Sequence, residues 1–193
     1  GRAVSDGPWA ALHADAVARL TAWAAPDEDQ ERLRVSLLEH LRAEPLAVAK
    51  AGPPAHLTAS VVVLDDALES VLLTHHRRAL AWFQLGGHLE TGDATLHAAA
   101  TREAVEESGI PMLTVLPEIV QLDRHVLDGD FGTCREHLDV RYAAVVASGV
   151  TPAVSSESLD LRWWPCNALP EQTRAELEPL VAAGRRAVRL SRR

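Results

Sequence analysis

The chain has 193 residues, of which 47% are hydrophobic and 24% charged, which is typical of one globular domain with a substantial core. Its net charge of −8 argues against a general nucleic-acid-binding protein, because attraction to phosphates requires a basic surface. The negative net charge does not exclude a phosphate substrate, since a bound metal ion can reverse the local electrostatic field.

Two cysteines, Cys134 and Cys166, are too few for a disulfide framework, and their spacing is not that of metal ligands. We therefore expect a reducing, cytoplasmic location. The first residues contain no unbroken apolar segment of the kind found in export signals, and no stretch of 18 apolar residues occurs. Neither export nor a membrane partner is expected.

Residues 8–43 predict two amphipathic helices, with apolar residues at near-helical intervals on both sides of Pro26. Pro45 ends the second helix, and residues 44–55, rich in proline and glycine, predict a linker. We therefore divide the chain into an N-terminal helical extension (1–50) and a main domain (51–193). The helices could cover a pocket or form a homodimer interface, although amphipathic helices more often face the core.

From His56 the pattern changes to strands. The β-branched, apolar segment 57–64 and the segment 70–76 predict two strands joined by a turn at Asp65-Asp66. The turn that contains Arg77 then leads through residues 81–87 into a glycine-rich loop.

A helix with clustered glutamates follows this loop. Glu103, Glu106 and Glu107 are spaced i, i+3 and i+4 and therefore share one face. Each such like-charged pair opposes an isolated helix by roughly 0.2–0.5 kcal/mol. A hard divalent cation such as Mg²⁺, which prefers carboxylate oxygens, would turn this repulsion into a binding site. The alternative for an isolated ExxEE pattern is a solvated acidic face.

The sequence around these acids resembles the Nudix box, whose pattern is G-x5-E-x7-R-E-U-x-E-E-x-G-U with U apolar. Residues 102–110, REAVEESGI, match every defined position. The first half departs from the pattern, because Asp93 stands in place of the first glutamate and eight residues, not seven, separate it from Arg102. The extra residue fits in the turn at Ala94-Thr95, before the helix. The loop itself, QLGGH, is similar to that of a subgroup with a histidine after the paired glycines.

After the box, Pro111 marks a break, and residues 113–127 predict one or two further strands. In residues 137–146 the alternation places His137, Asp139 and Arg141 on one face of a strand. A short strand at 161–166 and a helix from Thr173 complete the chain. This order indicates an α+β fold with helices flanking a mixed sheet. The resemblance implies the same architecture, a Nudix α/β/α sandwich, here preceded by the N-terminal helical segment.

The resemblance also implies hydrolysis of a diphosphate linkage in a nucleoside diphosphate derivative or similar small molecule, with Mg²⁺ or Mn²⁺. The metal ligands would be Glu103, Glu106, Glu107 and the carbonyl of Gly87, and Arg102 would orient the acids. The family often recruits a further carboxylate from a later loop as base or ligand, for which Glu157 is the first choice and Asp139 the second. For both, a plain exposed acid is an equal alternative.

Several residues near the loop could bind substrate. The best histidines are His88, inside the loop, and His137; His56, His75 and His76 also flank predicted strand ends. A structural role is the alternative for each, and their spacing does not form a zinc signature. Arg77 and Arg78 could contact a phosphate or be ordinary turn residues, and Asp139 shares the polar strand face with His137.

Two other functions compete with hydrolysis. A Nudix fold can be retained as a sensor that binds a nucleotide or sugar derivative without cleaving it, but the complete set of acids argues against this. Isomerisation of an isopentenyl-type diphosphate uses a cysteine on the same fold. Cys134 would have to serve, and nothing near it in sequence suggests that role.

Overall fold

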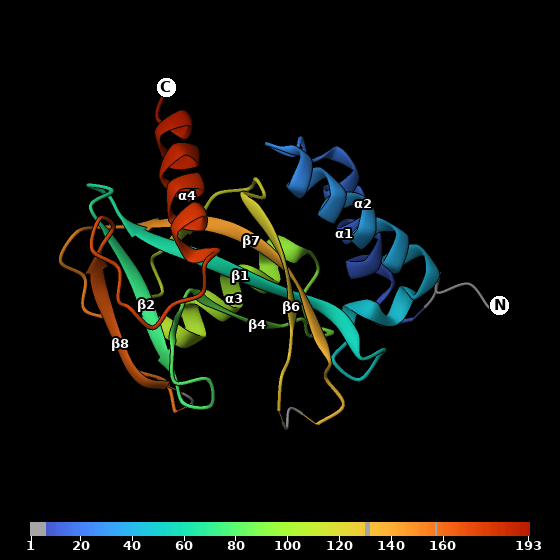
Figure 1. Ribbon diagram of the computed structural model, residues 1–193. Helices are drawn as coiled ribbons and strands as arrows, with labels where there is room; N and C mark the ends of the chain where they lie inside the picture. Colours follow the sequence, from blue (N-terminus) through green and yellow to red (C-terminus); the bar gives the residue numbers. More distant parts are fainter. Residues whose placement is uncertain (1–6, 130–131, 157) are drawn as a thin grey trace.

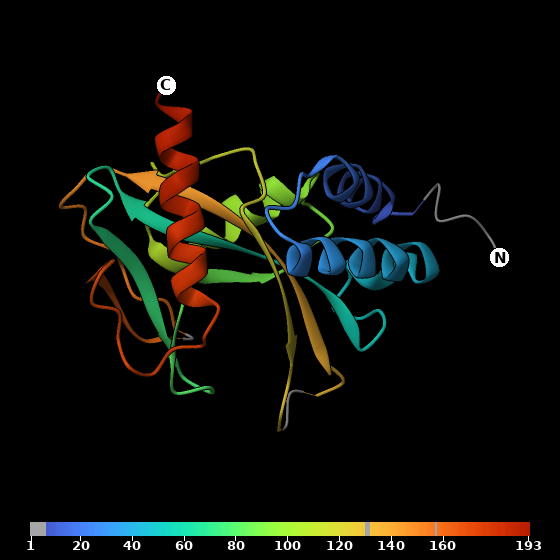
Figure 2. The ribbon, with the colours of Figure 1, turned by 45° about the horizontal axis from the view of Figure 1, so that its top comes forward.

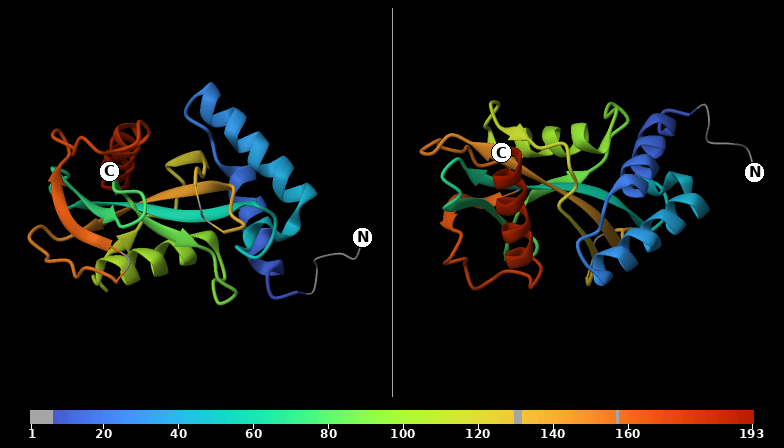
Figure 3. Two further views of the ribbon diagram at one scale, coloured as in Figure 1. Left: turned by 60° about the horizontal axis from the view of Figure 1, so that its bottom comes forward. Right: turned by 90° about the horizontal axis from the view of Figure 1, so that it is seen from above.

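A mixed β-sheet of eight strands forms the centre of the computed structural model, which describes residues 7–129, 132–156 and 158–193. Helix α3 (Leu96–Ser108) covers one face of the sheet and helix α4 (Leu177–Ser191) covers the other (Figures 1 and 3). The α+β sandwich with a mixed sheet, predicted from the order of the elements and from the resemblance, is confirmed.

The two longest strands, β1 (Ala55–Asp65) and β7 (Glu136–Val146), run parallel along their whole length at the centre of the sheet. The remaining strands pair with β1, with β7 or with each other, always in antiparallel fashion. These strands are β2 (Ser70–His76), β3 (Trp82–Phe83), β4 (Leu85–His88), β5 (Thr114–Val115), β6 (Gln121–Val126) and β8 (Ser158–Pro165). Strand β8 begins earlier than the sequence predicted, since pairing with β2 extends it to Ser158.

The unbroken apolar character of β1 follows from its burial on both faces. Alternate side chains of a strand point to opposite sides, so β1 contributes to two cores. The core beneath α3 contains Leu57, Ala59, Val61 and Val63. The core beneath α4 contains Val62 and Leu64. The sheet therefore lies between α3 and α4, and each helix packs on its own core.

Helix α3 is delimited by local signals. Thr95 caps its first turn by accepting a hydrogen bond from the Ala98 amide (3.0 Å), and Gly109 ends it in the left-handed conformation at φ 66°. Ala94 and Thr95, the turn expected to take up the extra residue of the motif, lie before the first residue of the helix.

The two predicted N-terminal helices are present as α1 (Ala10–Ala22) and α2 (Glu28–Ala43), packed at one end of the sheet (Figure 2). Asp27 caps α2. The apolar side chains of both helices lie in the same core as the residues beneath α3, and they include Leu12, Leu20, Leu37 and Leu41. The Gln30 side chain also joins α2 to β6 through both main-chain groups of Leu122, at 2.9 and 2.7 Å.

The segment predicted as a linker is packed instead. It contains a 3-10 helix, Pro45–Val48, in which Ala47 and Val48 are fully buried. Its apolar residues fill the space between α2 and β1, which the proline and glycine content did not reveal. Among the described helices, none combines the length and apolarity needed to span a bilayer.

If the N-terminal helices form part of the main core, shortening a buried leucine there should destabilise the whole protein. Leu41→Ala is expected to lower the free energy of unfolding by about 2–5 kcal/mol, because Leu41 is fully buried in the shared core. Urea unfolding followed by circular dichroism measures the effect.

Val35→Ala is the matched control, since Val35 lies in the same helix at 40% exposure. Its effect should stay within about 0.5 kcal/mol. Equal effects of the two substitutions, or a separate early transition in Leu41→Ala alone, would show that the helices fold independently of the sheet.

Candidate metal and substrate site

The glycine-rich strand β4 brings the backbone of the loop against the acidic face of α3. Strand β4 pairs with β1, so that Gly87 lies opposite Ala59. A Cβ atom added to Gly87 would lie 2.6–2.7 Å from the carboxylate atoms of Glu103. Only glycine allows so close an approach between this backbone and that side chain.

Arg102 connects the loop, the following turn and α3. Its Nε and Nη2 atoms donate to the two carboxylate oxygens of Asp93, each at 2.9 Å, and Nη2 also donates to the carbonyl oxygen of His88 at 3.0 Å. Its Nη1 atom donates to Glu103 at 3.0 Å and to Glu106 at 3.3 Å. The hydrogen bonds with Asp93, followed by those with Glu103, raise the pKa of Arg102. Asp93 therefore contacts this arginine despite its shorter side chain and the extra residue.

The turn before α3 is closed by the same aspartate. The amide of Glu90 donates to the Asp93 carboxylate at 2.8 Å, and the amide of Asp93 donates to the Glu90 carbonyl at 3.0 Å. The Glu90 carboxylate is also 3.3 Å from Arg102 Nη1. The turn thus places the Glu90 carboxylate beside those of Asp93, Glu103 and Glu106. These four carboxylates around Arg102 form the acidic cluster.

The acids of the cluster differ in exposure. The Glu103 side chain is only 14% exposed, whereas that of Glu106 is 57% exposed. Burial raises the pKa of Glu103, and the hydrogen bond from Arg102 opposes this rise. Four carboxylates, those of Glu90, Asp93, Glu103 and Glu106, share a single guanidinium. This excess of negative charge on oxygen donors fits a hard divalent cation.

A cavity of about 600 Å³ opens beside the cluster, with Gly87 and Glu107 in its wall. All four residues predicted to bind substrate also line it, namely Arg77, His88, His137 and Asp139. Arg78, which was expected beside Arg77 as a possible phosphate contact, lines it too. The lining residues that the sequence did not single out for substrate contact include Lys50, Phe83, Gln84, His125 and Arg174. The volume lies within the range of small-molecule sites.

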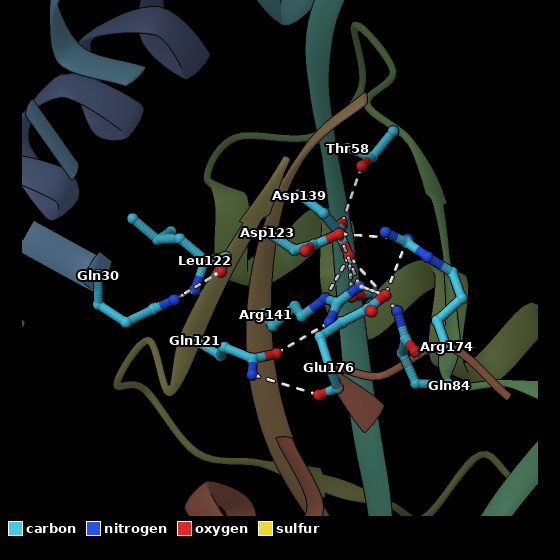
Figure 4. Close-up of polar contacts among 11 residues, drawn as sticks. Gln30, Thr58, Gln84, Gln121, Leu122, Asp123, Asp139, Arg141, Arg174 and Glu176 are labelled. Atoms are coloured by element: carbon cyan, nitrogen blue, oxygen red, sulfur yellow. Dashed lines mark hydrogen bonds and ion pairs between the residues drawn. The ribbon is translucent and has the colours of Figure 1, made fainter. Parts of the chain in front are cut away.

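The floor of the cavity is a buried polar network centred on Asp139 (Figure 4). Asp139 accepts hydrogen bonds from Thr58 at 2.8 Å, Ser60 at 2.6 Å and Arg141 Nε at 2.8 Å. Three donors thus hold the carboxylate in place, which favours a positioning role over proton transfer. The alternation in residues 137–146 correctly placed Asp139 and Arg141 on one face.

Arg141 extends this network to elements that are distant in sequence. Its guanidinium donates to Gln121 at 2.8 Å, and it lies 3.4 Å from Asp123 and 3.6 Å from Glu176. Arg174 contacts the same two acids, at 3.2 and 2.8 Å. No local sequence signal indicated that the segment before α4 would contribute to the site.

Three of the histidines noted at predicted strand ends come together, whereas His75 packs against Trp82 with a centroid distance of 5.0 Å. The rings of His56, His88 and His137 have centroids 4.9–5.4 Å apart. Burial, followed by the neighbouring histidines, lowers the pKa of His88 to about 3. Burial and His56 lower the pKa of His137 to about 4. Both are therefore neutral near pH 7 and do not offer a phosphate a positive charge.

Cys134, for which the sequence suggested no partner, adjoins this group, with its Sγ atom 3.6 Å from His56 Nε2. The sequence spacing of the two cysteines did not indicate metal ligands, and Cys134 meets the histidines only through the fold. The first choice for the additional carboxylate, Glu157, lies outside the described residues.

With this geometry in place, the chain was compared with known proteins. The model of the NUDIX domain matches residues 54–184. This chain belongs to the Nudix family and is a hydrolase of that family. The comparison with curated proteins found no match.

Solved Nudix structures share the fold. A NUDIX-family hydrolase from Clostridium perfringens is 25% identical, with a TM-score of 0.51 over 70% of this chain and 97% of that one. An Ap4A hydrolase from C. elegans is 19% identical, with a TM-score of 0.55 over 71% and 98%. The NUDIX domain of NrtR from Shewanella oneidensis, in complex with ADP ribose, is 18% identical, with a TM-score of 0.51 over 78% and 97%.

The contacts of Arg102 predict a stability effect at the aspartate of this Nudix site. Asp93→Asn should lower the free energy of unfolding by about 1–3 kcal/mol, because the guanidinium loses its charged bidentate partner while remaining largely buried. Asp128→Asn, the same change at an exposed position, should alter it by less than about 0.5 kcal/mol. Chemical denaturation of both variants provides the comparison, and equal values would contradict the role assigned to Asp93.

Proposed function

We propose that this Nudix hydrolase uses Mg²⁺ or Mn²⁺ to cleave the diphosphate linkage of a nucleoside diphosphate derivative or a similar organic pyrophosphate. One observation carries the proposal: the acidic face of α3 meets a side-chain-free backbone at Gly87, next to a cavity large enough for such a molecule. Oxygen donors, an excess of negative charge and an adjoining cavity together favour a site that holds a metal against a substrate's phosphates.

In this proposal Glu103, Glu107 and the carbonyl of Gly87 hold the metal, and Glu106 holds the metal or its water. Arg102 keeps the acids in position through its contacts with Glu103 and Glu106. A metal at this place would neutralise charge that develops on the phosphate oxygens and help to align the attacking water. Water attacks one phosphorus, the bond from that phosphorus to the bridging oxygen breaks, and that oxygen leaves with the other phosphate.

The proton of the attacking water requires an acceptor, and two residues remain candidates. Glu157 is the first choice on the resemblance alone. Asp139 is the weaker candidate, because hydrogen bonds from Thr58, Ser60 and Arg141 occupy its carboxylate.

The cavity wall also supports a phosphate-bearing substrate. Besides Arg141, which is paired with acids, four cationic residues line it, Lys50, Arg77, Arg78 and Arg174. They would attract the phosphates left uncompensated by the metal. Phe83 in the same wall offers an apolar surface to the organic part of the substrate. Ap4A and ADP ribose, named for two structural neighbours, belong to the class to be tested.

The proposal predicts the effect of removing one carboxylate charge. Glu106→Gln should reduce kcat by about 100-fold or more, with the fold intact because the side chain is 57% exposed. The assay is product release, with Mg²⁺ or Mn²⁺, from a panel of nucleoside diphosphate sugars, dinucleoside polyphosphates, nucleoside triphosphates and non-nucleotide diphosphates.

Glu118→Gln is the control, since Glu118 is exposed and is not among the residues lining the cavity. It should retain wild-type turnover. Unchanged turnover in Glu106→Gln would remove the proposed mechanism. Tight binding of a nucleotide derivative by the wild-type protein without any product would instead favour the sensor function.

A further inference from the structure

Four potential metal ligands of nitrogen and sulfur type meet beside the cavity. They are His56 on β1, His88 at the end of β4, His137 on β7 and Cys134 just before β7. One ligand atom from each of these residues lies within 4.8 Å of all the others. Sheet pairing creates the group, because His56 lies directly opposite His137 across the parallel β1–β7 pair.

Two of the distances, both to His56, agree with a shared tetrahedral ion. Bonds of about 2.05 Å to nitrogen and about 2.3 Å to sulfur separate two nitrogens by about 3.3 Å, and a nitrogen from a sulfur by about 3.6 Å, around tetrahedral Zn²⁺. The Nε2 atoms of His56 and His88 are 3.2 Å apart. Cys134 Sγ lies 3.6 Å from His56 Nε2.

The hydrogen bonds around the cluster leave its lone pairs directed inward. His56 Nδ1 lies 2.9 Å from the Pro53 carbonyl, which can only accept, so Nδ1 carries the proton of the neutral ring and Nε2 presents its lone pair. Such a carbonyl partner behind a histidine is typical of metal ligands. His137 Nε2 is buried and has no hydrogen-bond partner within the described part of the chain.

We propose that His56, His88, His137 and Cys134 bind a structural Zn²⁺ ion, at a centre distinct from the acidic cluster on α3. Three imidazoles and a thiolate suit zinc, whereas the carboxylates of α3 suit Mg²⁺ or Mn²⁺. Four protein ligands complete a tetrahedral shell, which makes the centre structural. Binding replaces the thiol proton of Cys134 with a zinc–sulfur bond and releases that proton to solvent, without any change of oxidation state.

The zinc centre would hold the loop on which the acidic site depends. The main-chain carbonyl of His88 accepts a hydrogen bond from Arg102, while the side chain of the same residue belongs to the cluster. Zinc would therefore fix the end of β4 to β1 and β7. The inference does not require the proposed hydrolysis, since it concerns only metal content and stability.

The first test measures metal content. The protein, purified after growth with added zinc and dialysed against metal-free buffer, should contain one zinc per chain by mass spectrometry. Cys134→Ser and, separately, His137→Ala should weaken zinc binding more than about 100-fold, since even residues behind a ligand change affinity by 10–100-fold. Cys166→Ser is the matched control, because Cys166 is the other free cysteine and packs, partly buried, against the core beneath α4.

The second test replaces zinc with Co²⁺. A tetrahedral site with a thiolate should show intense visible d–d bands and a near-ultraviolet sulfur-to-cobalt band, both retained in Cys166→Ser. The sulfur-to-cobalt band should disappear in Cys134→Ser. The double variant Glu103→Gln/Glu107→Gln should keep both signals, which separates this centre from the acidic cluster.

Thermal unfolding completes the test. A strong chelator should lower the Tm of the wild-type protein and should leave that of Cys134→Ser unchanged. Wild-type protein that binds neither zinc nor cobalt would overturn the inference, as would equal zinc affinity in Cys134→Ser and the wild type. If neither ligand variant folds, the wild-type metal content and the cobalt spectrum decide the question alone.

Discussion

The guanidinium of Arg102 is the interaction on which the site depends. It joins the turn closed by Asp93, the carbonyl at the end of β4 and the acidic face of α3. Without it, carboxylates that repel one another would surround a largely buried position, and the loop would lose its connection to the helix. One positive charge does not balance the carboxylates around it. The cluster therefore keeps an excess of negative charge that is suited to a further cation.

The two-residue period of a strand gives the loop two different chemistries. Gly87 lies against the carboxylate of Glu103, whereas the side chain of its neighbour His88 joins the imidazoles of His56 and His137. Hard oxygen donors thus lie next to Gly87, and nitrogen and sulfur donors surround the side chain of His88. The long parallel pairing of β1 with β7 makes the second group possible, since it places His56 and His137 side by side.

Local patterns were sufficient to predict the four described α-helices and the longer strands, whereas β4 was expected as part of a glycine-rich loop. Apolar periodicity indicated α1, α2 and β1, and the motif from Arg102 to Ile110 indicated the acidic helix. The alternation in β7 identified Asp139 and Arg141 as neighbours on a polar face. All of these depend on residues close together in sequence, where spacing alone decides which side chains share a surface.

Contacts between distant segments could not be predicted in this way. Thr58 and Asp139 are 81 residues apart and meet only because β1 and β7 pair in one register. The same register brings Cys134 to the histidines, although its sequence neighbours give no sign of a metal site. Arg174 reaches Asp123 across 51 residues, and no motif marks either residue. The packed segment at Pro45–Val48 was similarly hidden by its proline and glycine content.

Crystals soaked in Mn²⁺ and examined at the manganese absorption edge test the central claim most directly. The account predicts an anomalous peak between the carboxylates of Glu103 and Glu107, within bonding distance of the Gly87 carbonyl. Carboxylates that lie apart in solvent, with no manganese between them in well-ordered crystals, would contradict it.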